Sequence, residues 1–179
     1  MPHRRCLLAC LAVLGGLVGV PVTEAQVAMH AVAFVDLAGG ESSTAGAPRL
    51  HVASNAKQAA ELAKRVDRPD LTARLAKVDL RRCKVIGIFA GPMPSSGHRL
   101  EVKDVQVDRD TVRITVALIR PSPEQMVSDV ISYPYAIVAL PRSALPRHAT
   151  WCIVGTEDEP LVRKLPGQSC SLNGPSGAP

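Results

Sequence analysis

The feature that most constrains the fold is a two-residue alternation over residues 111–118, in which large apolar side chains alternate with Thr111, Arg113, Thr115 and Ala117. In an extended chain, this period puts the large apolar side chains on one face and the residues between them on the other. The segment therefore predicts a β-strand with one buried face. Its apolar positions are Val112, Ile114, Val116 and Leu118.

The residues before this strand show the same alternation, interrupted once. Leu100 and Val102 share one phase, and the phase slips at Lys103–Asp104 before the alternation resumes. A one-residue slip within a strand is typical of a β-bulge. Asp108–Asp110 then offers a tight turn, so residues 100–118 predict a β-hairpin.

The rest of the chain supplies further strands and two helical patterns. Asn55 and Gln58 form a start that resembles a capping box, and the alanines that follow recur at helical spacing, which predicts a helix over 56–66. A second short helix is expected from about Asp70 to Val78. Apolar stretches predict strands at 27–35, 50–53, 84–90, 135–140 and 151–154, and residues 39–48 predict a loop.

The helical patterns lie early in the chain and strands dominate the later part, without a regular strand-helix-strand alternation. This order indicates an α+β fold. We expect a small, mostly antiparallel β-sheet of five to seven strands, packed with one or two short helices.

The N-terminal 25 residues have the pattern of a secretory signal peptide. Arg4 and Arg5 precede an apolar run that ends near Val22, and small residues follow at Thr23–Ala25. The alternative is an uncleaved membrane anchor, but the run is shorter than the about 20 residues of a span and is interrupted by glycine and proline. We therefore expect residues 1–25 to be removed and the protein to be exported to a periplasmic or extracellular location.

The remaining chain predicts one domain over residues 26–155 and a tail over 156–179 that is rich in Pro, Gly and Ser. The net charge of +5 is small and spread along the chain. Such a distribution argues against a nucleic-acid-binding arm and against a polybasic membrane patch. We expect neither a nucleic-acid partner nor stable membrane insertion after the signal is removed.

Three cysteines remain after residue 25, and export would place them in an oxidising compartment. A Cys152–Cys170 disulfide would tie down the tail and stabilise the fold by about 3 kcal/mol in the chain-entropy model. A Cys83–Cys152 pair across neighbouring strands is the rival, and three unpaired thiols are a third possibility. Metal-ligand spacings such as CxxC or HxxxH do not occur, so neither a metal nor a cofactor is expected.

The sequence contains none of the common catalytic signatures, such as a GxSxG elbow, a phosphate-binding loop or HExxH. Ser95, Ser96 and His98 share one segment, so a serine hydrolase site with an acid such as Asp129 is an alternative. A turn whose hydroxyl groups bond to its own backbone explains the same residues, with His98 exposed at the start of a strand.

Aromatic side chains gather beside a proline-containing loop. Tyr133 and Tyr135 are two of the five aromatic residues and flank Pro134, which cannot join an interior strand ladder. Aromatic side chains in loops often anchor interfaces. The same residues could instead pack to fix the start of a strand.

Residues 83–140 resemble the C-terminal domain of the PrcB-type protease-complex subunits. An apolar strand that ends in glycine, a Pro-Thr-Gly-Gly-Tyr turn and a Pro…Gln…Ser/Thr-x-Pro-Tyr-x-Ile-Val segment are similar to stretches of this sequence. In the turn, Ser96 replaces a glycine and His98 replaces a tyrosine. The matching stretches are Val85–Gly91, Pro94–His98, Pro121, Gln125 and Ser132–Val138.

The resemblance implies an exported, non-enzymatic protein that associates with a partner, such as a secreted or surface protease, and stabilises it or helps to assemble it. It brings no catalytic residues. An envelope protein that binds a small ligand in a pocket between helix and sheet is the alternative. We expect partner contacts on the two proline-containing loops, 91–98 and 121–134, and on sheet edges. The candidate residues are Ser95, His98, Gln125, Tyr133, Pro134 and Tyr135.

Overall fold

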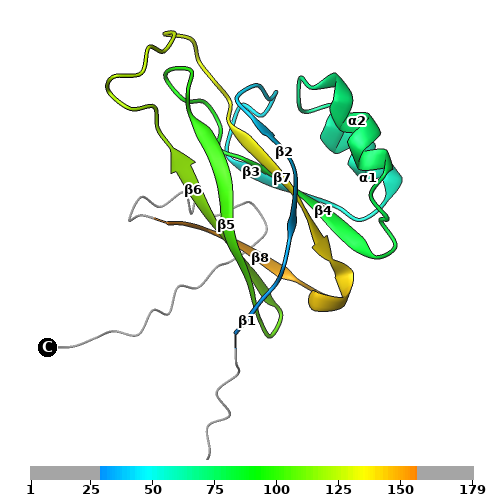
Figure 1. Ribbon diagram of the computed structural model, residues 1–179. Coiled ribbons are helices and arrows are strands. Elements are labelled where there is room, and N and C mark those ends of the chain that lie inside the picture. The colour runs from blue at the N-terminus through cyan, green and yellow to red at the C-terminus, as the bar shows by residue number, and fades with distance from the viewer. Residues whose placement is uncertain (1–28, 157–179) are drawn as a thin grey trace, which may run out of the picture.

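Eight strands and two short helices build residues 29–156, the part of the chain that the computed structural model describes. Figure 1 shows two sheets with both helices on one side. The strands are β1 (His30–Ala31), β2 (Val35–Gly40), β3 (Arg49–Ala53), β4 (Cys83–Phe89), β5 (Arg99–Asp108), β6 (Thr111–Ile119), β7 (Tyr135–Pro141) and β8 (Thr150–Gly155). The helices are α1 (Ala56–Ala63) and α2 (Pro69–Ala76), and a 3-10 turn, η1, spans Arg142–Ala144.

The predicted hairpin is the centre of the first sheet, whose strand order is β1-β5-β6-β8. β5 and β6 pair antiparallel, and their register shifts between Val102 and Asp104, so the predicted bulge is confirmed. Arg109 takes a positive φ of 51° at the tight turn between them. β8 joins the outer side of β6 in parallel.

The second sheet has the order β2-β7-β4-β3 and is antiparallel throughout. Its inner face packs against the apolar face of the first sheet, and one continuous cluster joins β4 and β7 to β5 and β6. This sandwich is the main core, because alternate residues of both sheets point into it. Fully buried members include Ile86, Val105, Ile114, Val138 and Leu140.

The helices cover the outer face of the second sheet, which is therefore buried on both sides. Leu62 of α1 and Leu71 of α2 are fully buried there. Leu62 lies over Gly87 of β4, where an added Cβ would collide with its side chain. Glycine at this position lets α1 approach the sheet closely.

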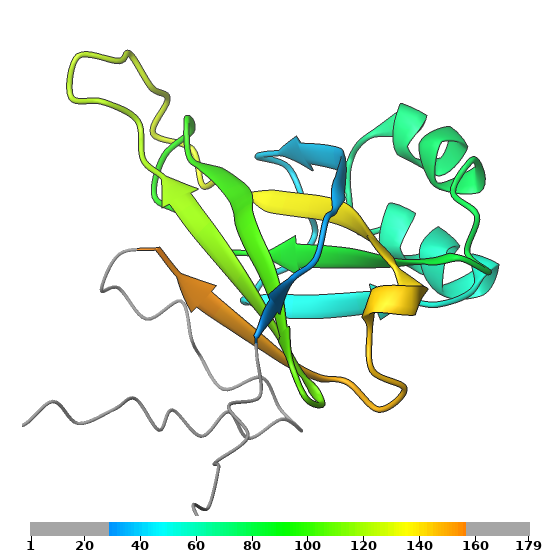
Figure 2. The same ribbon diagram turned by 60° about the horizontal axis from the view of Figure 1, so that its bottom comes forward.

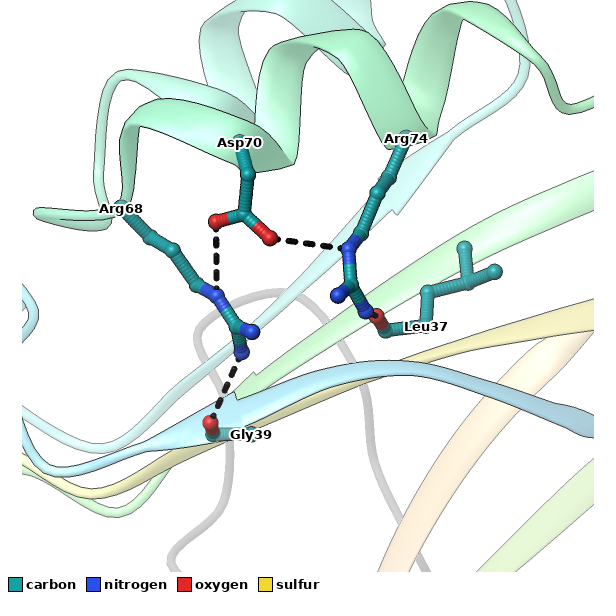
Figure 3. A network of polar contacts seen from close by, with 5 residues as sticks. All are labelled: Leu37, Gly39, Arg68, Asp70 and Arg74. Carbon is teal, nitrogen blue, oxygen red and sulfur yellow. Dashed lines mark hydrogen bonds and ion pairs between the residues drawn. The ribbon is translucent and has the colours of Figure 1, made fainter.

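A polar network holds α2 against β2, the edge strand of the second sheet (Figure 3). Asp70 accepts from Arg68 at 2.8 Å and pairs with Arg74 at 2.9 Å. The two guanidinium groups also donate to carbonyl oxygens of β2, Arg68 to Gly39 and Arg74 to Leu37. An exposed edge strand can pair with a strand of another chain through its free carbonyl groups. The two arginines occupy two of these groups on β2.

The predicted α+β class, with mostly antiparallel strands and two short helices, is confirmed. The eight strands form two sheets rather than one small sheet of five to seven strands. The predicted strand 27–35 is interrupted, because β1 pairs with β5 and β2 pairs with β7, so the chain changes sheets between them. Residues 27 and 28 lie outside the described part.

The predicted helix boundaries need two corrections. The first helix ends at Ala63 rather than at residue 66, because Val66 turns into the core and bridges to Ser43. The second begins at Pro69, and Asp70 lies in its first turn. Residues 1–28 and 157–179 are outside the described part, so the expected signal peptide, domain limits and tail remain predictions.

Candidate protein-interaction site

The two proline-containing loops lie side by side beyond the ends of the sheets (Figures 1 and 2). We call residues 91–98 and 121–134 the paired loops. Met93 and Ser132 exchange backbone hydrogen bonds at 2.8 and 3.0 Å. Nearer the tip, Ser96 donates its backbone N–H to the Ser128 carbonyl oxygen, and the Ser96 hydroxyl oxygen accepts from the Ser128 N–H at 2.9 Å. The two loops therefore hold each other in one arrangement.

Gly97 makes the close approach of the two loops possible. Its φ is +85°, in the region that side-chain-bearing residues rarely adopt. A Cβ at this position would lie 3.1 Å from both Pro121 and Val127 of the facing loop. The positive φ thus falls on Gly97 and not on Ser96, so the serine that replaces a family glycine causes no backbone strain.

Glu41 connects both loops to the end of β2. Its carboxylate accepts the Gly97 N–H at 2.8 Å, and its backbone oxygen accepts the Tyr133 N–H at 2.7 Å. Charge-assisted hydrogen bonds of this kind are stronger than those between neutral groups. One residue therefore fixes the paired loops to the body of the protein.

The tip of the longer loop presents apolar side chains to solvent. We call Met126–Ile131 the loop tip; four of its six residues are large and apolar. Met126 is 99% exposed and Ile131 is 63% exposed. Figure 2 shows this loop projecting on the side away from the helices. Clustered apolar exposure on an ordered loop is typical of an interaction surface.

The charges around the loop tip are acidic. Glu124 and Asp129 are exposed, and residues 121–141 contain neither Lys nor Arg. The chain as a whole carries a net charge of +5. The loop tip is therefore an apolar and acidic projection from a basic protein.

The candidate partner-binding residues occupy different environments in and beside the paired loops. Gln125 is exposed next to the loop tip, whereas Tyr133 is half-buried and Pro134 is buried. Tyr135 is only 2% exposed and packs against the Phe89 ring. Its hydroxyl group faces Arg68, whose pKa is raised first by the hydrogen bond to Asp70 and then by Tyr135. In this conformation Tyr135 fixes the start of β7 and offers no ring surface to a partner.

Ser95 and His98 form the inner part of the paired loops. The Ser95 carbonyl oxygen accepts from the Ser132 hydroxyl at 2.6 Å and lies 3.0 Å from Nδ1 of His98. The expected exposure of His98 is wrong: its side chain is 7% exposed because it packs beneath the loops. These contacts of the Ser95 carbonyl oxygen with Ser132 and His98 help to hold the two loops together.

The loop tip lies within the loop 121–134 on which the sequence predicts partner contacts, but none of its residues is among the candidates that the sequence named individually. The available signal was an apolar run, Met126–Ile131, that has neither the period of a strand nor that of a helix and lies between prolines. Glu41 gave no such signal, because its contacts are with residues more than fifty positions away along the chain.

An apolar groove lies between α1 and α2, with a volume of about 540 Å³. It is lined mainly by small side chains of the two helices, including Ala60 and Ala76, and by Leu75. Asp79 and Arg81 contribute charged groups. Its position differs from the expected one, because the groove lies between two helices rather than between helix and sheet.

Cys83 is a free thiol, so the rival Cys83–Cys152 pairing is wrong. Cys170 lies outside the described residues, and the Cys152–Cys170 pairing stays a prediction. Within residues 29–156, His, Cys, Asp and Glu side chains form no cluster of three that could hold a metal ion. The helices of the same region are too short to cross a membrane.

The family model described as PrcB C-terminal matches residues 84–141 of the chain. The matched segment is about a third of the chain and runs from β4 to β7, so it contains the hairpin and both of the paired loops. Neither a curated protein nor a solved structure matches the chain. The resemblance of this part of the chain to the C-terminal domain of the PrcB-type family is thus confirmed.

Proposed function

We propose that this protein is an exported, non-enzymatic subunit that binds a protease and stabilises its folded state. The PrcB C-terminal match suggests a protein associated with a protease complex. The observation that carries the proposal is the loop tip, where Met126 and Ile131 are exposed on a loop that several hydrogen bonds hold in place.

The mechanism follows from mass action. A subunit that binds the folded protease but not its unfolded chain shifts the folding equilibrium towards the folded form. An interface of this kind needs apolar side chains in a defined position, because a loop that must be ordered on binding loses affinity. The hydrogen bonds of Ser96, Ser128 and Glu41 supply that order in advance.

The experiment is affinity purification of the tagged, full-length protein from its own host, followed by quantitative mass spectrometry. We expect one protease to co-purify with the wild type and to be depleted more than about tenfold with Met126→Asp. Val35→Asp is the matched control, because Val35 is 62% exposed and lies on β2 outside the paired loops. Equal recovery with Met126→Asp would contradict the assignment of the surface, and absence of any protease would contradict the function.

The groove between α1 and α2 supports a second candidate function, the binding of a small apolar ligand. A concave apolar site with a few polar groups is the usual form of a ligand pocket. With a volume of about 540 Å³, the groove is in the usual size range. Native mass spectrometry of protein purified from the host would test this function. A bound small molecule that is lost in Ala60→Phe, which fills the groove, would support it; an unliganded wild-type mass would contradict it.

A further inference from the structure

We infer that the loop tip inserts Met126 into an apolar pocket of the partner protease whose rim carries Lys or Arg side chains. The inference rests on the proposed function and adds the chemistry of the surface that the partner must offer. It follows from three features of the loop tip: exposure of Met126, the placement of the acidic residues, and the absence of basic residues.

Met126 has the position of an anchor residue. It is the most exposed large apolar side chain of the described residues, at 99%, while Val127 beside it is 37% exposed and touches the Gly97 side of the facing loop. A methionine side chain has three rotatable bonds and adapts to irregular apolar pockets. Interface energy typically concentrates in one or a few such side chains that become fully desolvated.

The charges near Met126 indicate which charges the rim of the partner's pocket must carry. Glu124 and Asp129 lie two and three residues from Met126, and both are exposed. Carboxylates at the edge of an interface favour positive charge opposite them and speed association at low salt. A rim of Asp or Glu on the partner would instead repel both groups.

The same charges disfavour a lipid surface as the target. Membrane-inserting loops and surface helices typically use Lys and Arg for anionic headgroups and Trp or Tyr for the interface. Residues 121–131 contain none of these four residue types. The apolar side chains of the loop tip are therefore matched to a protein pocket.

The experiment is site-specific photo-crosslinking of the full chain in its own host, with p-benzoylphenylalanine in place of Met126. We expect a crosslink to an apolar peptide of the protease with Lys or Arg nearby. The same photoreactive residue in place of Val35 is the control, and we expect it to give no such crosslink. A crosslink to an acidic surface, or to lipid, would overturn the inference.

Charge reversal gives a second measurement that does not depend on crosslinking chemistry. We expect Glu124→Lys with Asp129→Lys to weaken protease binding at least about tenfold and to reduce its salt dependence. The control is Glu61→Lys on the exposed side of α1, which should bind as the wild type does. Unchanged binding by the double variant would overturn the inference.

The two proposals fail in different ways. If the protease co-purifies but Met126 gives no crosslink to it, the function stands and this inference is wrong. If Met126→Asp impairs only flotation of the protein with phosphatidylglycerol vesicles, and not its binding to the protease, the partner of the loop tip is a membrane. The inference is then also wrong. Failure of any protease to co-purify contradicts the proposed function itself.

Discussion

At the residue scale, Gly97 is a position where one added side-chain atom would disturb the contact between the paired loops. Gly97→Ala adds a Cβ at a φ of +85° and places it 3.1 Å from Pro121 and Val127. We expect the free energy of unfolding to fall by roughly 1–2 kcal/mol, measured by urea denaturation. Gly46→Ala is the control, because an added Cβ meets no atom within 4 Å there. Equal stability of both variants would contradict the proposed role of Gly97.

Arg142 is a second residue whose side chain makes several hydrogen bonds to the backbone. Its Nε atom donates to the carbonyl oxygens of Leu80 and Cys83 at 3.0 and 3.1 Å, and its Nη2 atom donates to Ser54. These bonds join η1 to the ends of β3 and β4.

Removal of this side chain leaves three half-buried carbonyl groups without their donor. We therefore expect Arg142→Ala to lower the free energy of unfolding by about 2–3 kcal/mol, measured by urea denaturation. Arg147→Ala, at an exposed position nearby, should change it by less than about 0.5 kcal/mol. A loss for Arg142→Ala no larger than that of Arg147→Ala would show that the three bonds contribute little.

At the element scale, α2 and β2 are joined through Asp70, and this contact depends on pH. The hydrogen bond from Arg68, and then the charges of Arg68 and Arg74, hold the pKa of Asp70 below its ordinary value. A lowered pKa in the folded state means that the contribution of Asp70 is complete above the ordinary pKa of about 3.9. It is lost as the pH falls through the lower pKa of the folded state.

We therefore expect Asp70→Asn to lower the thermal midpoint at neutral pH, with a difference from the wild type that shrinks below about pH 4. The effect should be small, because the ion pairs are about half exposed. Thermal denaturation of both proteins as a function of pH measures it, and Glu61→Gln on α1 serves as the control. A difference that does not change with pH would show that the charge of Asp70 is not the cause.

The elements themselves were predictable where the pattern was local. The alternation of Val112, Ile114 and Val116 and the slip at Lys103–Asp104 predicted the hairpin and its bulge, because each depends only on neighbouring residues. The division into two sheets was not predictable in the same way. It depends on the parallel pairing of β8 with β6 and on the change of partner between β1 and β2, which are contacts between distant segments.

The candidate site was predictable only in part for the same reason. Prolines and aromatic residues identified both loops, but the hydrogen bonds of Ser96 with Ser128 join residues 32 positions apart. Tyr135 was a candidate because of its residue type, whereas its environment in the core follows from the packing of β7 between two layers.

At the scale of the whole molecule, the cysteines test the expected connection between the domain and its tail. We predict that Cys152 is bonded to Cys170 in the exported protein and that Cys83, a free thiol on β4, reacts with an alkylating reagent. Peptide mapping under non-reducing conditions measures both. Cys83→Ser should leave the disulfide intact. A Cys83–Cys152 peptide, or alkylation of all three cysteines, would contradict the prediction.

At the scale of the whole molecule, the loop that carries the loop tip and the two helices lie on different sides (Figure 2). The groove lies between the helices. The match to the PrcB C-terminal family covers the paired loops but not α1 or α2. The loop tip of the proposed association therefore lies within the matched segment, whereas the groove between the helices lies outside it.

The most direct test of the central claim is the thermal stability of the co-purified protease, measured with increasing amounts of this protein. Binding to the folded protease predicts a melting temperature that rises with the concentration of the wild type and of Val35→Asp. Met126→Asp should produce no rise over the same concentrations. A protease whose melting temperature is unchanged by the wild type, or is raised equally by Met126→Asp, would contradict the account.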